Sequence, residues 1–278
     1  MRVAIGIEIG GTKLQAGVGG EDGRLLGRAR RTVDPARGAQ GIRESIPGLV
    51  DQALDEARIE RKDVAGIGVG FGGPVDTTKG VTLVSHQIEG WDQFPLRQWL
   101  ADCFQVPVAI QNDASLAGYA EAAGGAGKGC RRVFYMTIGS GIGGGWIAEG
   151  VIDEGQGLGA AEIGHTWVPD PDTGEPEKLE LLCSGWSIGR RAREAVEEGE
   201  ISIMPRLCGG DPAAITAETV YTAAEQDDLL ARALLQLRRG RPARAGQALH
   251  PLPRLRQEGR GQDGPLRRHG RGLRSEER

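Results

Sequence analysis

The chain has 278 residues, of which 39% are hydrophobic, and a formal net charge of −4. This length is enough for one large domain or two modest ones with a real hydrophobic core. No stretch approaches the roughly 18 consecutive apolar residues of a membrane span, and the start of the chain lacks the features of a signal peptide, so we expect a soluble, cytoplasmic protein with no membrane partner. The length excludes a small disulfide-stapled scaffold, and the four cysteines, far apart and without a CxxC pair, fit buried or free thiols better than a disulfide framework.

Charge is distributed unevenly along the chain. Residues 238–278 contain twelve arginines and four acidic residues, a net charge of +8, so the first 237 residues carry −12. This Arg/Gly/Pro-rich segment has few aliphatic residues and no periodic pattern, and we expect it to be disordered. Two interpretations stay open: an arm that binds nucleic acid, and translation in a wrong reading frame, which is favoured because the composition changes within a helix-like stretch.

The apolar patterns predict strands that alternate with helices, and one unit occurs twice. In each copy a strand runs into a glycine turn and a second strand follows: residues 3–9, 10–13 and 14–18 first, then residues 133–138, 139–145 and 146–148. The other expected elements, in chain order, are a helix at 41–58, strands at 65–70 and 106–111, a helix at 114–123 and an amphipathic helix at 225–237. The alternation predicts an α/β architecture, and the duplication predicts two lobes that face a shared cleft.

The second glycine turn also fits the GxGxxG pattern of dinucleotide-binding folds at residues 139–144. That pattern needs a helix directly after the loop, because the helix N-terminus holds the pyrophosphate, whereas the following residues are broken by glycine and strand-like. The GxxxxGK[ST] sequence of a P-loop does not occur. We therefore expect neither NAD nor FAD, but two turns whose backbone N–H groups can hold phosphate.

Five segments, taken together and in this order, resemble those of the ROK family of sugar kinases and repressors, which includes bacterial glucokinases. They are residues 8–13 (EIGGTK), 72–76 (GGPVD), 112–114 (NDA), 137–145 (TIGSGIGGG) and 162–165 (EIGH). The resemblance covers about residues 1–235 and implies an α/β, actin-like (ribonuclease-H-like) ATPase fold of two lobes around a cleft. We expect these lobes at 1–120 and 121–237, the second incomplete, because the family's late GGG segment is missing from the chain.

The resemblance implies an ATP-dependent hexose kinase, most simply a glucokinase, that uses Mg²⁺. Asp113 would be the catalytic base of this kinase and would also contact the sugar. Because Asp113 begins a helix that follows an apolar strand, we expect the helix dipole to keep the Asp113 carboxylate ionised. Without the resemblance, Asn112 and Asp113 would indicate a plain helix N-cap. The other implied groups are sugar ligands (Gly73, Asn112, Glu162, His165 and Glu180), nucleotide-phosphate ligands (Gly10, Gly11, Thr12, Lys13, Thr137, Gly139, Ser140 and Gly141) and Glu8, which would help to hold Mg²⁺.

The chain departs from the family pattern at its metal-related positions. Glu8 stands where most members have aspartate, so its carboxylate reaches one methylene further toward the metal. The family's CxCGxxGCxE zinc site cannot form, because residues 165–180 contain no cysteine, and we expect no zinc.

Competing hypotheses remain for the function. One is a catalytically impaired or non-catalytic sugar-binding protein, and another is an RNA-binding protein that uses the Arg/Gly segment. We do not expect a DNA-binding repressor, because no helix-turn-helix fits ahead of Glu8. A homodimer is allowed, since the family is often dimeric.

Overall fold

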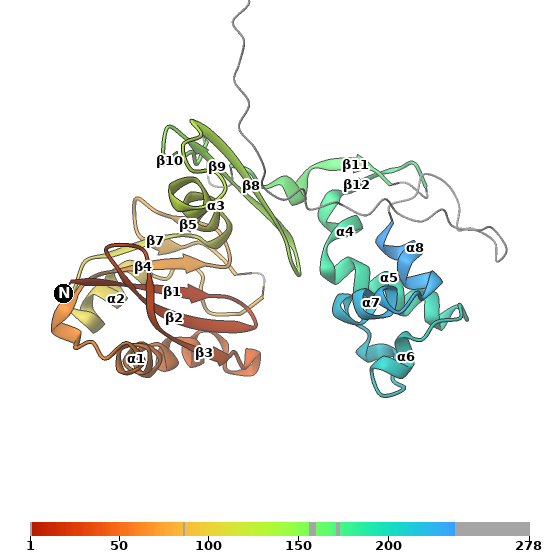
Figure 1. Cartoon of the computed structure of the whole chain (residues 1–278), viewed down its shortest axis with the longest axis horizontal. Coiled ribbons are helices and arrows are strands. Elements are labelled where there is room, and N and C mark those ends of the chain that lie inside the picture. Colours follow the sequence, from red (N-terminus) through yellow and green to blue (C-terminus); the bar gives the residue numbers. More distant parts are fainter. Residues whose placement is uncertain (1, 86, 156–159, 171–172, 237–278) are drawn as a thin grey trace, which may run out of the picture. The chain divides into compact units, whose positions relative to one another are not determined.

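The computed structural model describes residues 2–85, 87–155, 160–170 and 173–236. All elements below lie within these residues and are drawn in Figure 1. The segment 238–278, for which the sequence predicts disorder, lies outside the described residues.

Strands and helices alternate through the first half of the chain, and helices dominate the second. The strands are β1 (Val3–Ile9), β2 (Lys13–Gly20), β3 (Leu25–Thr32), β4 (Val64–Phe71), β5 (Val75–Asp76), β6 (Val81–Thr82), β7 (Val108–Asn112), β8 (Arg132–Ile138), β9 (Ile142–Ala148), β10 (Val151–Ile152), β11 (Trp167–Pro169) and β12 (Pro176–Lys178). The α-helices are α1 (Gly38–Ala57), α2 (Leu96–Phe104), α3 (Asp113–Gly124), α4 (Leu179–Cys183), α5 (Gly185–Glu197), α6 (Met204–Leu207), α7 (Ala217–Glu225) and α8 (Leu229–Leu235). Short 3₁₀ helices are η1 (Pro35–Arg37), η2 (Arg61–Asp63), η3 (Ile163–His165) and η4 (Pro212–Ala214).

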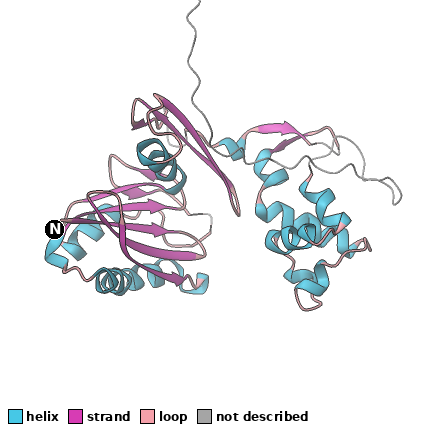
Figure 2. Ribbon diagram, viewed as in Figure 1, coloured by secondary structure: helices cyan, strands magenta, loops and turns pink. Residues whose placement is uncertain are grey.

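A five-stranded sheet in the order β3-β2-β1-β4-β7 carries the first half of the chain. Alternate residues of β1 are buried, which is the pattern of a strand with one face against a core, and α1 packs on the sheet over β2 and β3 (Figure 2). Strands β1, β4 and β7 run parallel, and their registers align Ile9 with Phe71 and Phe71 with Asn112. The loops that follow these three strands therefore start at one edge of the sheet, where ligands bind in open α/β sheets.

A three-stranded sheet in the order β10-β9-β8 packs against α3. The duplicated unit predicted from the sequence is confirmed, because β1–β2 and β8–β9 are both antiparallel hairpins. The second turn is shorter than expected, since β9 starts at Ile142 and includes three glycines of the predicted loop. A Cβ at Gly144 would lie 2.4 Å from the carbonyl oxygen of Ala161, and one at Gly145 would lie 2.9 Å from Cα of Ser115. These glycines thus allow neighbouring backbone to approach a strand.

Helices α5 to α8 enclose a second apolar core, which includes Met204, Ile215 and Val220. The predicted helix at 225–237 starts too early, because α7 ends at Glu225 and α8 begins at Leu229. Asp227 has a left-handed φ of 65°, and the Asp228 carboxylate accepts a hydrogen bond from Ala231 N at 2.8 Å, so a helix cap separates the two helices. In the described part of the chain, no helix combines the length and apolarity needed to cross a bilayer.

Candidate functional site

The candidate site lies where β1, β4 and β7 end. Asn112, the last residue of β7, is the N-cap of α3, and its Oδ1 accepts a hydrogen bond from Ser115 N at 3.0 Å. Asp113 is therefore the first residue of the helix, and its Oδ1 accepts from Ala114 N at 2.8 Å. The strand-to-helix junction predicted from the sequence is confirmed, and Asn112 alone acts as the cap.

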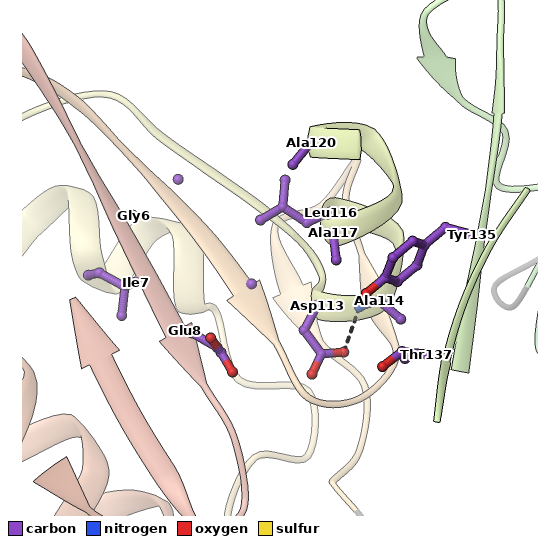
Figure 3. Close-up of a pocket in the computed structure, with 12 residues that line it drawn as sticks. Gly6, Ile7, Glu8, Asp113, Ala114, Leu116, Ala117, Ala120, Tyr135 and Thr137 are labelled. Carbon is purple, nitrogen blue, oxygen red and sulfur yellow. Dashed lines mark hydrogen bonds between the residues drawn. The ribbon is translucent and has the colours of Figure 1, made fainter. Parts of the chain in front are cut away.

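A cavity of about 490 Å³ opens beside Asp113 (Figure 3). Glu8 from β1 and Thr137 from β8 line the same cavity, and the Glu8 and Asp113 carboxylates end in it. Its remaining lining is small or apolar and comprises Gly6, Ile7, Gly68, Gly70, Ala114, Leu116, Ala117, Ala120 and Tyr135. The structure thus brings two predicted carboxylates and one predicted phosphate ligand to one pocket.

Burial raises the pKa of the Asp113 carboxyl, and the negative charges of Glu8 and Glu162 raise it further. The hydrogen bond from Ala114 N opposes the shift without cancelling it. The sequence predicts that the helix N-terminus keeps Asp113 ionised; burial and the two neighbouring carboxylates oppose that effect, and the ionisation itself stays a prediction. A carboxylate with a raised pKa holds a proton more tightly, which suits a group that accepts one.

The turn between β1 and β2 presents backbone donors. Gly10 N donates to Lys13 O at 3.0 Å, and the Thr12 carbonyl accepts from Val33 N at 2.9 Å. The N–H groups of Gly11 and Thr12 have no acceptor among the residues that the structure describes. Successive free N–H groups in a turn form a site for an anion, so the predicted role in phosphate binding has a structural basis.

The turn between β8 and β9 has the same character. Gly139 N donates to Gly141 O at 2.8 Å, and within the described chain the N–H groups of Ser140 and Gly141 are left without acceptors. The carbonyls of Gly139 and Ser140 instead accept hydrogen bonds from the first turn of α5, at 2.8 and 3.1 Å. The helix N-terminus therefore fixes the carbonyl side of this turn and leaves its N–H side for a ligand.

Glu180 lies at this second turn and does not line the Asp113 cavity. Its Oε2 accepts a hydrogen bond from Ile142 N at 2.8 Å, and a Cβ at Gly141 would lie 2.6 Å from the same oxygen. Its Oε1 accepts no hydrogen bond from the described residues. Glu180 thus holds the β8–β9 turn with one oxygen and keeps the other available.

The remaining predicted sugar ligands surround Asp113 unequally. Gly73 contributes its carbonyl, which accepts from Asn112 Nδ2 at 3.3 Å. Glu162 occupies the position before η3 without a capping hydrogen bond from its side chain, and it is close enough for its charge to act on Asp113. His165 ends the same 3₁₀ helix, is exposed and does not line the cavity.

The sequence did not reveal a polar link that supports the Asp113 junction. Gln111 Nε2 donates to Glu154 Oε1 at 2.9 Å, and Thr77 Oγ1 donates to Glu154 Oε2 at 3.1 Å. Glu154 thereby connects the end of β7 to the turn after β5. No local pattern could have found this contact, because the three residues are 34 and 43 positions apart.

The residues of the cavity fit a magnesium ion. Carboxylate oxygens are ligands that Mg²⁺ prefers, and the ion usually keeps several waters and binds through one or two carboxylates and substrate phosphates. Glu8 supplies one such carboxylate in the cavity, and Gln15 Nε2 donates a hydrogen bond to Glu8 Oε2. The described residues contain no group of three His, Cys, Asp or Glu side chains that could hold a metal ion. Water and substrate phosphate would therefore supply the other ligands of the ion. The expected lack of zinc stays a prediction.

Comparisons with known proteins agree with this arrangement. The profile of the ROK family matches residues 4–248. A glucokinase of Halalkalibacterium halodurans is 30% identical over 233 residues, which cover 82% of this chain and 70% of that relative. An N-acetylmannosamine kinase of Escherichia coli is 30% identical over 238 residues, which cover 84% of this chain and 73% of that relative. The crystal structure of a ROK family glucokinase from Streptomyces griseus, in complex with glucose and AMPPNP, superposes with a TM-score of 0.71 at 31% identity and covers 84% of this chain and 74% of its own. The fold is the α/β, actin-like ATPase fold of these proteins, and the chain belongs to the ROK family.

Proposed function

We propose that this chain is an ATP-dependent kinase that transfers the γ-phosphoryl group to a hydroxyl of a hexose, most simply glucose. The observation that carries the proposal is the Asp113 carboxylate, which has a raised pKa and ends in the same cavity as Glu8. The glucose and AMPPNP bound to the Streptomyces griseus relative support sugar and ATP as the two substrates.

Asp113 acts as the base in this reaction. The sugar hydroxyl oxygen attacks the γ-phosphorus, the bond to the oxygen that bridges to the β-phosphate breaks, and the hydroxyl proton moves to Asp113. The raised pKa of Asp113 makes the carboxylate a better acceptor for this proton, provided that it is ionised before the reaction. Sugar phosphate and ADP are the products.

The two glycine turns hold the phosphates of the nucleotide. Phosphoryl transfer depends mainly on positioning and on neutralising charge at the transferred group. The free N–H groups of Gly11 and Thr12 in one turn, and of Ser140 and Gly141 in the other, are donors that need no reorganisation. The exposed ammonium group of Lys13 and the hydroxyl of Thr137, which lines the cavity, complete this set.

Polar side chains of the predicted set hold the sugar. The resemblance assigns Glu162, His165, Asn112 and Glu180, whose Oε1 accepts no hydrogen bond from the described residues, to the sugar hydroxyls. Glu8 would help to hold Mg²⁺, which when bound neutralises phosphate charge. The hexose itself stays open, because relatives at about 30% identity include both a glucokinase and an N-acetylmannosamine kinase.

The test is direct detection of a sugar phosphate. The purified chain is incubated with ATP, Mg²⁺ and, separately, glucose, mannose, fructose, N-acetylglucosamine or N-acetylmannosamine, and the products are identified by mass spectrometry. We expect glucose 6-phosphate as the main product. Failure of every sugar to yield a phosphate, together with no sugar-specific heat in calorimetry, would refute the proposal.

A sugar-binding protein without kinase activity is the second candidate. The observation that favours it is that His165 and Glu180, which the resemblance assigns to the sugar, do not line the cavity that holds Asp113 and Glu8. This candidate predicts heat from sugar binding but no sugar phosphate. The two measurements above therefore separate the candidates.

A further inference from the structure

Glu8 has different neighbours on the two sides of its strand. In the register of the sheet, Glu8 of β1 lies opposite Gln15 of β2 and Gly70 of β4. Gly70 has no side chain, and a Cβ there would lie 3.5 and 3.6 Å from Cα and Cβ of Asp113. Asp113 therefore lies against the bare backbone of Gly70, and Figure 3 shows the Glu8 and Asp113 carboxylates at the same cavity. Glu8 is thus flanked by a carboxylate on the β4 side and by an amide on the β2 side.

The amide of Gln15 holds one oxygen of Glu8. Gln15 Nε2 donates a hydrogen bond to Glu8 Oε2, and within the described chain Glu8 Oε1 accepts no hydrogen bond. Gln15 is exposed between the buried residues Leu14 and Ala16, so its side chain lies on the face of β2 that is turned away from the apolar core. Among the described residues, the Gln15 side chain forms this hydrogen bond and no other. The contact with Glu8 is therefore what fixes the Gln15 side chain.

A neutral donor suits a carboxylate that has to bind a cation. A lysine or arginine in the place of Gln15 would form an ion pair with Glu8 and oppose the binding of Mg²⁺, whereas an amide donates a hydrogen bond and leaves the negative charge in place. In the part of the chain that the structure describes, Glu8 forms no ion pair. Arg30 of β3 lies opposite Gln15, and so two strands away from Glu8. The charge of Glu8 therefore stays available to a metal ion.

A glutamate needs such a donor more than an aspartate does. Its carboxylate is one methylene further from the backbone and has one more torsion to fix, so more rotamer freedom is lost when the side chain is ordered around an ion. A hydrogen bond made before the ion binds reduces that loss, which is the general effect of preorganisation. Hydrogen-bond partners of metal-binding carboxylates commonly orient them in this way. Gln15 is the residue whose position meets this need at Glu8.

We propose that Gln15 is a positioning residue for Mg²⁺, which holds Glu8 Oε2 through its amide and leaves Oε1 as the oxygen that Glu8 offers to the ion. This inference rests on the proposed function, because nucleotide phosphate supplies further ligands of the ion. The alternative is a cross-strand pair that only stabilises the β1–β2 hairpin. The two roles differ in a measurable quantity, since a purely structural pair does not change how much Mg²⁺ strengthens the binding of a nucleotide.

Calorimetry with AMPPNP and the full chain tests this role without any turnover. The Kd of AMPPNP is measured once with excess Mg²⁺ and once with EDTA, and the ratio of the two values gives the gain in affinity from the ion. We expect Gln15→Leu, which removes the donor, to reduce this gain about tenfold and to leave the Kd in EDTA within twofold. Gln98→Leu is the matched control, because Gln98 Nε2 donates to Asp102 Oδ1 at 2.8 Å on the exposed surface of α2, and we expect it to change neither value.

A double-mutant cycle shows whether Gln15 acts through Glu8. Glu8→Asp shortens the carboxylate by one methylene and withdraws it from the Gln15 amide, so Gln15→Leu should change the gain from Mg²⁺ less than twofold in this background. An equal effect of Gln15→Leu in both backgrounds, an equal loss of AMPPNP affinity with Mg²⁺ and with EDTA, or no gain from Mg²⁺ in the unmodified chain would overturn the role of Gln15. A chain that shows the expected pattern but phosphorylates no sugar would refute the proposed kinase and leave the role of Gln15 standing.

Discussion

Replacement of Asp113 with asparagine tests the proposed base directly. Asparagine keeps an oxygen that can accept the hydrogen bond from Ala114 N, which is 2.8 Å long in the structure, but it cannot take a proton from the sugar. A positioned base contributes about 10²–10⁴ to the rate, so we expect kcat to fall by that factor, or by about 2.7–5.4 kcal/mol of barrier. The sugar affinity should stay within several-fold, because the shape and the hydrogen bonds of the site are kept.

The same substitution should stabilise the fold at neutral pH. Burial, Glu8 and Glu162 raise the pKa of Asp113 above its ordinary value of 3.8, so the ionised carboxylate is less favourable in the folded than in the unfolded chain. The free energy of unfolding should therefore fall as pH rises from the unfolded pKa through the folded pKa of Asp113. Asparagine removes this penalty, and we expect a higher Tm at pH 7 than in the unmodified chain.

Steady-state kinetics with a coupled ADP assay and thermal unfolding from pH 3.5 to 8 provide the two readouts. Asp102→Asn is the control, because Asp102 is an exposed aspartate on α2, away from the cavity, and we expect it to change neither kcat nor the pH profile. A variant at Asp113 that keeps more than about a tenth of kcat would remove this residue from the role of base. An unchanged pH profile of stability would contradict the effect of burial on its pKa.

Three further predictions concern the supporting structure. Gln111→Glu should lower kcat about tenfold or more, because it places a second carboxylate against that of Glu154. Adding Glu154→Gln should restore most of the lost kcat. Steady-state kinetics of the unmodified chain, the two single variants and the double variant test this coupling. The pKa of Asp76 is lowered, mainly because Lys79 N donates a hydrogen bond to its carboxylate at 2.9 Å. The ionised Asp76 therefore stabilises the fold above its unfolded pKa, and this stabilisation is lost as pH falls through the folded pKa. Thermal scans should show that Asp76→Asn lowers Tm at pH 7 and has little effect on Tm at pH 2. Gly27→Ala would place a methyl group 2.5 Å from a carbonyl oxygen of α1 and should cost about 1–3 kcal/mol in urea unfolding, with unchanged sugar affinity.

Local sequence determined much of the framework and the position of the proposed base. The apolar runs and glycine turns predicted both hairpins, because strand periodicity and turn chemistry act over a few residues. The same reasoning located Asp113 at a strand-to-helix junction, which the structure confirms. Neither result depends on contacts between distant parts of the chain.

Tertiary structure decided the features that depend on distant residues. Gly144 and Gly145 belong to β9 and not to the turn, because they pair with Met136 and Tyr135 of β8, and the close approach of Ala161 and Ser115 leaves no room there for a side chain. Burial and the charges of Glu8 and Glu162 raise the pKa of Asp113, although the sequence favoured the effect of the helix dipole. The hydrogen bond between Gln111, at the end of β7, and Glu154 also joins residues that are distant in the sequence. Packing, desolvation and charge depend on which residues meet in space, and only the folded chain brings these residues together.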